Sequence, residues 1–449
     1  MTDKPSYKQS HFSNYSEEYE LVDDVWEQLA RFEDLRRYLP ARLNESGSSY
    51  LLRQQTTALP SSFRDGIEKA AGRLGKAQVS EDALEPIEAL VSGVDEQKTT
   101  LDFFVFRVFV EIMKKQCCVV IVDTTGEQEP ATLQLIPVTS IQNVYVDKQT
   151  GRVLSLTIAE EDYRPDGRYG VSKVKRYREY TESELIIWED VKGQLMQSSE
   201  PMELTDANQR SRGEVFAVWF GTIGSTPWMP AAPPLLQYAK LSVHQMHKVS
   251  DLDRAETIAA LPPILRYLPE GAPDAGELDD VLWDPGSVEN VPFGGDLRPA
   301  QTSSQDFAAM HQRNQDRQER LDTFADNYLK EKARTDLQAT MADDAETSRL
   351  ELYVKSLQDG FSKVFRFVMR LSDRTYNPNV SPGELILSAT KYDQVTDNEI
   401  KLLGDTLFRG AIDQRTAFEI ARQQWKSRGY DIPEQSSAAS LPDPTMIIE

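Results

Sequence analysis

Apolar residues recur every three or four positions over residues 16–39, which predicts an amphipathic helix. Ser16 is placed to cap its N-terminus, and Glu17 and Glu18 suit the positive end of the helix dipole. The chain therefore begins with a helix that packs one face against a core.

Two further helices are predicted before residue 117. Residues 62–77 form a short helical pattern, with Gly75 as its expected end. Residues 100–116 are apolar almost all round, which is typical of a buried helix. Lys114 and Lys115 in the last turn of that segment suit the negative end of a helix.

The pattern then changes to short runs of β-branched and aromatic residues separated by turn residues. The six runs are CCVVIVD, IQNVYVD, RVLSLTIAEED, KVKRYREYT, ELIIWED and EVFAVWFG. Strands this close together can be joined by hairpins, so they predict an antiparallel meander. Helices followed by such strands make the first half α+β.

The second half contains two long helical segments around a compact region. After the proline-rich TPWMPAAPPLL, residues 233–260 predict one long helix and residues 304–329 another. Residues 261–302 are rich in Gly and Pro and predict a small β-structured module, which an antiparallel helix pair could carry at its tip. Residues 311–320 contain no apolar side chain, so this part of the second helix has nothing to bury in its own domain.

A heptad pattern follows, with spacings that alternate between four and three. Its positions are Leu350, Val354, Leu357, Phe361, Val364, Val368 and Leu371. Such a seam predicts a long helix with one apolar edge. Beyond it we expect a strand at 384–390, a helical hairpin within 397–430 and a disordered tail from residue 434.

Composition indicates a globular, water-soluble protein. The chain has 449 residues, enough for two or three domains, with 39% hydrophobic and 27% charged residues. No apolar run approaches the ~20 residues that cross a bilayer, and the N-terminus lacks the apolar region of a secretory signal. We therefore expect folding in the cytosol and no membrane partner.

Charge and cysteine content narrow the function classes. The net charge of −22 argues against a protein that grips DNA tightly, although it suits a surface past which DNA slides. Cys117 and Cys118 are neighbours, so they form neither a disulfide framework nor a CxxC metal site. They are expected to be small buried residues of a strand.

One group of possible metal ligands lies on the first long helix. His244, His247 and Asp251 share a helix face, but no fourth ligand is evident, so a packed or solvated face is favoured and no metal is expected. The DTTG sequence at residues 123–126 lacks a P-loop lysine and is expected to be a hairpin turn.

Asp343, Asp344 and Glu346 could together hold Mg²⁺ in a nuclease. An acidic first turn ahead of an apolar helix accounts for them equally well through the helix dipole. The chain has no GxSxG, HExxH or Walker sequence, so neither an enzyme activity nor a cofactor is expected.

The order of parts and three motifs resemble the portal proteins of tailed bacteriophages. The motifs are PPLLQYAKLSVH (residues 233–244, with Ser250 and Asp251 after it), TMADDAETSRLELYVKSL (340–357) and GAIDQRTAFEIARQQW (410–425). The resemblance covers residues 16–430, and the order of the motifs carries it. One departure is LKEKARTDL at residues 329–337, where that family often has a glycine-rich stretch.

The resemblance implies an α+β phage portal fold and a ring, in that family a dodecamer, around a DNA channel. The implied parts are a wing (1–231), a first stem helix (232–260), a clip (261–302), a second stem helix (303–329), a tunnel loop region (330–343), a heptad helix toward the crown (344–372), a C-terminal wing or crown strand with a helical hairpin (373–433) and a disordered tail (434–449).

The resemblance also implies a function. The ring would sit at one capsid vertex of the virion, after assembly in the host cytoplasm, and conduct double-stranded DNA without sequence preference during genome packaging and ejection. The implied partners are further copies of the chain, the major capsid protein, a terminase, and then head–tail adaptor or neck proteins.

Specific residues follow from this resemblance. The implied sites are Arg313, Arg317 and Arg320 between subunits of the stem, Lys330, Lys332 and Arg334 near DNA in the tunnel loop, and Asp279, Asp280, Trp283 and Asp284 for docking on the clip. Two alternatives remain open: a phage-encoded metal-dependent nuclease, and a non-viral scaffold that dimerises through the heptad helix.

Overall fold

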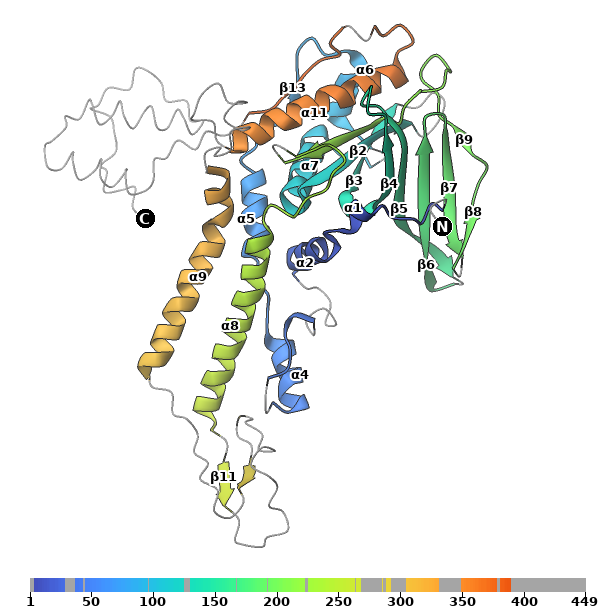
Figure 1. Cartoon of the computed structure of the whole chain (residues 1–449). Coiled ribbons are helices and arrows are strands. Elements are labelled where there is room, and N and C mark those ends of the chain that lie inside the picture. Colours follow the sequence, from blue (N-terminus) through green and yellow to red (C-terminus); the bar gives the residue numbers. More distant parts are fainter. Residues whose placement is uncertain are drawn as a thin grey trace, which may run out of the picture. The chain divides into compact units, whose positions relative to one another are not determined.

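Helices and mainly antiparallel sheets are combined in one fold, and β11 and β12 form one parallel pair, so the predicted α+β class is confirmed (Figure 1). The computed structural model describes residues 4–28, 37–42, 45–95, 97–124, 130–166, 168–191, 193–222, 225–262, 264–267, 285, 288–291, 304–330, 349–377 and 380–388. All of them belong to one structural unit, Met1–Ser388.

The helices are α1 (Ser10–Ser13), α2 (Ser16–Trp26), α4 (Gly47–Thr56), α5 (Ser62–Ala71), α6 (Glu85–Ser92), α7 (Leu101–Lys115), η1 (Val138–Ser140), α8 (Leu236–Ala260), α9 (Ser304–Lys330) and α11 (Arg349–Ser372). The strands are β1 (Gln78–Val79), β2 (Cys117–Thr124), β3 (Ala131–Pro137), β4 (Ile141–Val146), β5 (Val153–Asp166), β6 (Gly170–Thr181), β7 (Glu184–Val191), β8 (Gln194–Gln197), β9 (Met202–Glu203), β10 (Ala217–Gly221), β11 (Ile264–Tyr267), β12 (Val288–Val291) and β13 (Leu385–Ile386).

Strand β2 is the centre of a three-stranded antiparallel sheet with the order β10-β2-β3. Successive side chains of a strand point to opposite faces. Cys117, Val119 and Ile121 therefore enter a core cluster shared with β4 and β5, while the Cys118 thiol lies on the other face, 4.0 Å from the Val108 carbonyl of α7. Burial on both faces explains the unbroken apolar run, and the prediction of two buried strand cysteines is confirmed.

The two thiols should be unreactive in the folded protein. Burial raises the pKa of both cysteines, since a thiolate would be desolvated there. Reaction with a disulfide reagent at pH 8 is expected to be at least about 100-fold slower in buffer than in urea, because only the exposed thiolate reacts. Rapid release of the chromophore from the native protein would contradict this burial.

Strands β4 to β7 form the predicted antiparallel meander, in that order. Strand β8, which was not predicted, extends the meander, and β9 pairs with β7. The meander does not include the first and last of the six predicted runs. Those runs are β2 and β10, which pair with each other in the separate three-stranded sheet. Strand β3 was not predicted, since its seven residues contain few β-branched side chains and end in Pro137.

The heptad seam of α11 packs inside this chain. Phe361 is fully buried and contacts the rings of Phe104 on α7, Phe220 on β10 and Phe365 on α11, at centroid distances of 5.2–6.4 Å. Next to it, a Cβ added to Gly360 would lie 2.3 Å from the Phe220 ring, so the helix approaches β10 as closely as a glycine allows. The seam therefore stabilises the α+β core, which contradicts its predicted use for dimerisation in the scaffold alternative.

Several predicted helix ends are wrong. Helix α2 stops at Trp26 instead of residue 39, and Gln28 after it adopts a positive φ of 58°. Its first helical residue is Ser16, so this serine is not the cap. Helix α5 ends at Ala71, before Gly75, whose backbone N–H donates to the Ser388 carbonyl.

The remaining predictions concern domain division and the C-terminal region. The division into wing, stem, clip and crown stays a prediction. Residues 389–449, with the expected helical hairpin and tail, lie outside the described residues. Among the helices that the structure does describe, none combines the length and apolar character of a bilayer-spanning segment.

Candidate functional site

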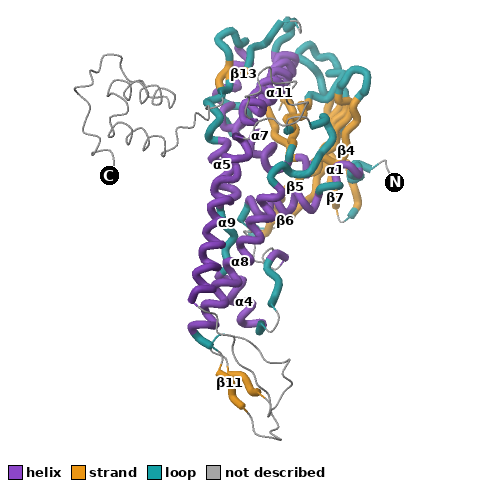
Figure 2. The backbone as a smooth tube through the Cα atoms, turned by 60° about the vertical axis from the view of Figure 1, so that its left-hand side comes forward, coloured by secondary structure: helices purple, strands orange, loops and turns teal. Residues whose placement is uncertain are grey.

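Helices α8 and α9 lie side by side and antiparallel (Figures 1 and 2). Near the start of α8, the Tyr238 ring stacks on Phe324 of α9 at 4.4 Å. Two turns further along α8, the Gln245 side chain donates to the Asn314 carbonyl at 3.1 Å. Residues further along α8 therefore contact residues with lower sequence numbers on α9, so the two helices run antiparallel. This is the arrangement expected for two helices joined through a tip module.

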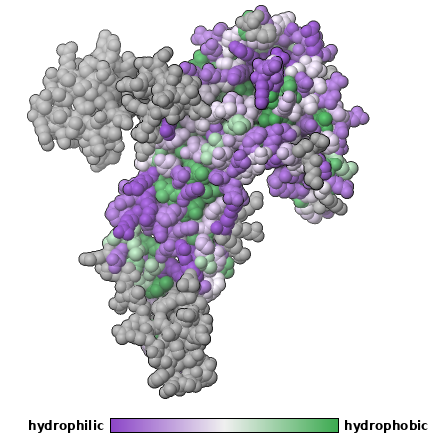
Figure 3. All heavy atoms as spheres, in the orientation of Figure 1, coloured by the Kyte–Doolittle hydropathy of each residue, from purple (hydrophilic) through white to green (hydrophobic). Residues whose placement is uncertain are grey.

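Only the C-terminal third of α9 reaches the core. Leu321, Phe324 and Leu329 are buried, and Phe324 also stacks on Phe63 of α5. Between residues 306 and 320, all described, no side chain is buried. The visible surface over α9 is accordingly mostly hydrophilic, with smaller hydrophobic areas nearby (Figure 3).

The polar part of α9 does make some contacts within its own chain. The Ser62 hydroxyl on α5 donates to the Asp322 carboxylate at 2.6 Å and accepts from the Gln318 amide. His311 contacts the carboxylate of Glu256 on α8. These contacts hold one side of α9, and the other sides remain exposed.

Two of the three predicted interface arginines line a groove between α8 and α9. The groove has a volume of about 300 Å³ and is lined by Lys248, Asp251, Leu252, Ala255, Met310, Arg313, Asn314 and Arg317. Arg317 is half-buried and donates to the Asn314 side chain at 3.0 Å, while Arg313 is exposed. Arg320 is exposed three residues beyond Arg317 and is not part of the lining.

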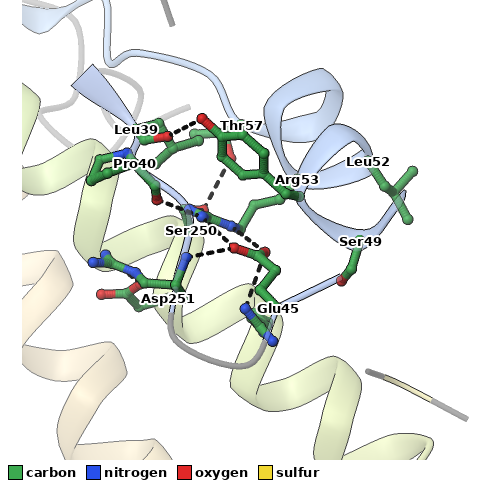
Figure 4. Close-up of polar contacts among 12 residues, drawn as sticks. Leu39, Pro40, Glu45, Ser49, Leu52, Arg53, Thr57, Ser250 and Asp251 are labelled. Atoms are coloured by element: carbon green, nitrogen blue, oxygen red, sulfur yellow. Dashed lines mark hydrogen bonds and ion pairs between the residues drawn. The ribbon is translucent and has the colours of Figure 1, made fainter. Parts of the chain in front are cut away.

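A buried ion-pair cluster, made of Glu45, Arg53 and Arg254, attaches the segment before α4 to α8 (Figure 4). The Glu45 side chain has 0% exposure and receives two hydrogen bonds from Arg53, at 2.7 and 2.8 Å. Arg254 of α8 lies 3.0 Å from the same carboxylate. This bidentate pairing with Arg53 fixes the orientation of the Glu45 carboxylate.

Desolvation alone would raise the pKa of Glu45. The hydrogen bonds from Arg53 and from the Arg42 backbone N–H oppose it, together with the charges of Arg53 and Arg254. The result is a pKa below the ordinary glutamate value, so the group is ionised at neutral pH. The cluster thus functions as a charged contact between the first 60 residues and the helix pair.

Neutral hydrogen bonds surround Arg53 as well. Its guanidinium donates to the Pro40 carbonyl at 2.8 Å, and the Thr57 hydroxyl donates to Ser250 of α8 at 3.0 Å. The Tyr50 hydroxyl on α4 donates to the Leu39 carbonyl, which links α4 to the segment before it. Residues on both sides of α4 therefore fold around one guanidinium group (Figure 4).

The members of this cluster were not predicted. Residues 38–62 read as a loop-rich connection, whereas the structure has helix α4 there. A single Glu and Arg within this stretch resemble ordinary surface charges. The eight-residue spacing of Glu45 and Arg53 does not by itself predict a buried ion pair, because the two charges become buried only when α8 covers them.

Two of the three candidate metal ligands on α8 have other partners. His247 contacts the Tyr38 carbonyl, and Asp251 accepts two contacts from Arg42, at 2.7 and 2.9 Å. No group of three His, Cys, Asp or Glu suited to a metal occurs among the residues that the structure describes. These side chains attach the N-terminal segment to α8.

Other predicted site residues lie beyond the described parts of the chain. They are the clip residues Asp279, Asp280, Trp283 and Asp284, the tunnel-loop residues Lys332 and Arg334, and the nuclease candidates Asp343, Asp344 and Glu346. Lys330 is the last residue of α9, and its side chain is outside the description. Of the DTTG turn, the described Asp123 pairs with Arg212 at 3.1 Å.

The chain matches one family model and chains of several solved structures. Residues 234–371, which include α8, β11, β12, α9 and all but the last residue of α11, match the family model "Domain of unknown function (DUF4055)". No curated protein matches the sequence. A chain of the solved structure titled "Neck of empty GTA particle computed with C6 symmetry" matches at 10% identity over 85% of this chain and 89% of that chain, with a TM-score of 0.30, at which a shared fold is not established.

Proposed function

We propose that this chain is the portal subunit of a tailed bacteriophage. Copies would assemble into a ring, a dodecamer by resemblance, at one capsid vertex and conduct DNA into and out of the head. The ring would bind a terminase during packaging and head–tail adaptor proteins afterwards. The role is structural and involves no catalysed reaction.

The polar, exposed surface of α9 carries this proposal. Residues 306–320 contribute no buried side chain, although the helix continues for 27 residues. An isolated polar helix gains little from packing, so such a length suggests support from neighbouring molecules or a solvated passage. A ring of helix pairs around a water-filled channel supplies both.

The antiparallel α8–α9 pair provides the second support. The start of α8 and the end of α9 both lie at the α+β body. In the sequence, residues 261–303 connect the other ends of the two helices. In the proposed ring, α8 and α9 are the stem, and Asp279, Asp280, Trp283 and Asp284 belong to the clip that partners bind. The heptad helix α11, in which Phe361 packs against α7 and β10, would lead toward the crown.

Charge fits the proposed passage of DNA. A net charge of −22 repels phosphates, so DNA would not be held in one register. Lys330, Lys332 and Arg334 would be basic positions near the DNA, next to the end of α9. The same acidic surface keeps free subunits soluble before assembly in the host cytoplasm.

Electron microscopy and native mass spectrometry of the purified full chain test the proposal. We expect annular particles with a central opening and a mass that is a whole multiple of the subunit mass. A species that stays monomeric at every concentration, or a plain dimer, would exclude the portal role.

A further inference from the structure

The α8–α9 pair has two long faces, one on each side of the seam where the helices meet. The groove lies on one of them. At about 100° per residue, the positions opposite the groove can be assigned along both helices. The two faces differ in charge.

The groove face is basic around an apolar floor. Leu252, Ala255 and the 43% exposed Met310 form the floor. Lys248, Arg313 and Arg317 provide three positive charges in the same lining.

The acids on the groove face do not cancel this charge. Asp251, the one acid of the lining, is paired with Arg42. Asp306 lies on the same side of α9 but beyond the lining, toward the N-terminus of the helix. The nearby His244 has a lowered pKa, first through partial burial and then through the positive charges of Lys248 and Arg317.

The opposite face is acidic. On α9, Glu319 lies about 160° from Arg317. Asp322 lies about 180° from Arg313, but its carboxylate already accepts from Ser62 of its own chain. On α8, Asp253 lies about 140° from Lys248, beside the 37% exposed Val249.

No lysine or arginine occupies the described positions of this acidic face, which are Val249, Asp253 and Thr257 on α8 and Ala308, Gln315, Glu319 and Asp322 on α9. The pKa of Asp253 is raised, first by partial burial and then by the negative charge of Glu256, with a smaller opposing effect of His311 on α9. A positive partner would relieve this repulsion.

We propose that the groove face of one copy binds the acidic face of the next copy, so that Arg313 and Arg317 pair with Asp253 or Glu319 of the neighbour. This inference rests on the proposed ring and identifies the surfaces that form it. The apolar floor of the groove would be covered by small or apolar side chains of the neighbour, such as Val249 and Ala308.

Two different, complementary surfaces make a head-to-tail interface. Such an interface cannot close within a dimer and leads to a ring or a filament. Like charges on matching faces would disfavour the two-fold alternative, in which groove meets groove. The charge asymmetry therefore favours a cyclic arrangement.

Reversing the charges in two sets tests the pairing. The groove variant carries Arg313→Glu and Arg317→Glu, and the acidic-face variant carries Asp253→Lys and Glu319→Lys. Each variant alone places like charges across every interface, and we expect subunit affinity to fall more than about 100-fold, with rings lost in native mass spectra. An equimolar mixture of the two should again form rings, with equal numbers of each subunit, because each interface then joins opposite charges.

Controls separate the possible outcomes. Lys148→Glu with Glu200→Lys, exposed positions outside the helix pair, should leave ring formation unchanged. Urea unfolding must show that each reversed variant folds as the unmodified chain does. Rings formed by either variant alone would overturn the assigned pairing but leave the portal proposal intact, whereas absence of rings from the unmodified chain would overturn both.

Discussion

Replacing Glu45 with alanine is expected to lower the free energy of unfolding by about 3–5 kcal/mol. The substitution leaves the guanidinium of Arg53, whose side chain is 6% exposed, and that of Arg254, 13% exposed, without their shared carboxylate. A charge that stays buried after its partner is removed costs far more than a surface pair is worth. Equilibrium urea unfolding, followed by circular dichroism, measures the change.

The control for this prediction is Glu68→Ala. Glu68 pairs with Arg64 at 2.8 Å, but both side chains are at least 40% exposed, so a change below about 0.5 kcal/mol is expected. Equal losses for the two variants would show that the Glu45 cluster is solvated.

The pH dependence of Glu45 follows from the sign of its shift. Its pKa is lower in the folded chain than in the unfolded chain. Its contribution to stability is therefore complete above the unfolded value, about 4.3, and is lost as the pH falls through the lower folded value. The difference in stability between the parent and Glu45→Ala should shrink in that acidic range.

The Phe361→Ala substitution is expected to cost about 3–5 kcal/mol as well, because a fully buried aromatic ring is replaced by a cavity. Phe361 contacts α7 and β10 in addition to its own helix, so the loss should unfold the α+β body as a whole. Thermal and urea unfolding give the magnitude.

Lys363→Ala on the same helix is the matched control, since Lys363 is exposed and its loss should change stability by less than about 0.5 kcal/mol. Should Phe361→Ala instead keep full stability and convert a dimer to monomers, the seam would be an intermolecular surface, as in the scaffold alternative.

Much of the fold could be predicted because its signals are local. The runs of β-branched and aromatic residues in β4 to β7 and the heptad spacing in α11 are local signals, and the structure contains both elements. The position of the long polar helix was also predicted correctly, since α9 covers Ser304–Lys330 and the prediction was 304–329. The α+β class follows from such patterns alone.

The division of the strands into two sheets could not be predicted. Strand β10 pairs with β2 across about 100 residues, and nothing in EVFAVWFG specifies that partner. The end of α2 was missed for a related reason. The apolar spacing continues to residue 39, while the backbone turns at Gln28 with a positive φ that the pattern does not encode.

The candidate site was predictable only in part. The charges of Arg313 and Arg317 were identified from the sequence, but the groove that collects them with Lys248 depends on how α8 and α9 pack. Glu45 and Arg254 are separated by more than 200 residues, and each is unremarkable alone. Burial of charge is a property of the assembled elements, so local patterns do not report it.

Because α11 approaches β10 closely, the side chains allowed at residues 220 and 360 depend on each other. Any side chain at residue 360 would occupy the space that the Phe220 ring fills, with as little as 2.3 Å between them. A glycine within a helix costs about 1 kcal/mol relative to alanine, so it persists only where bulk is forbidden. Related chains should therefore vary residues 220 and 360 in concert, a smaller group at one site admitting a larger group at the other.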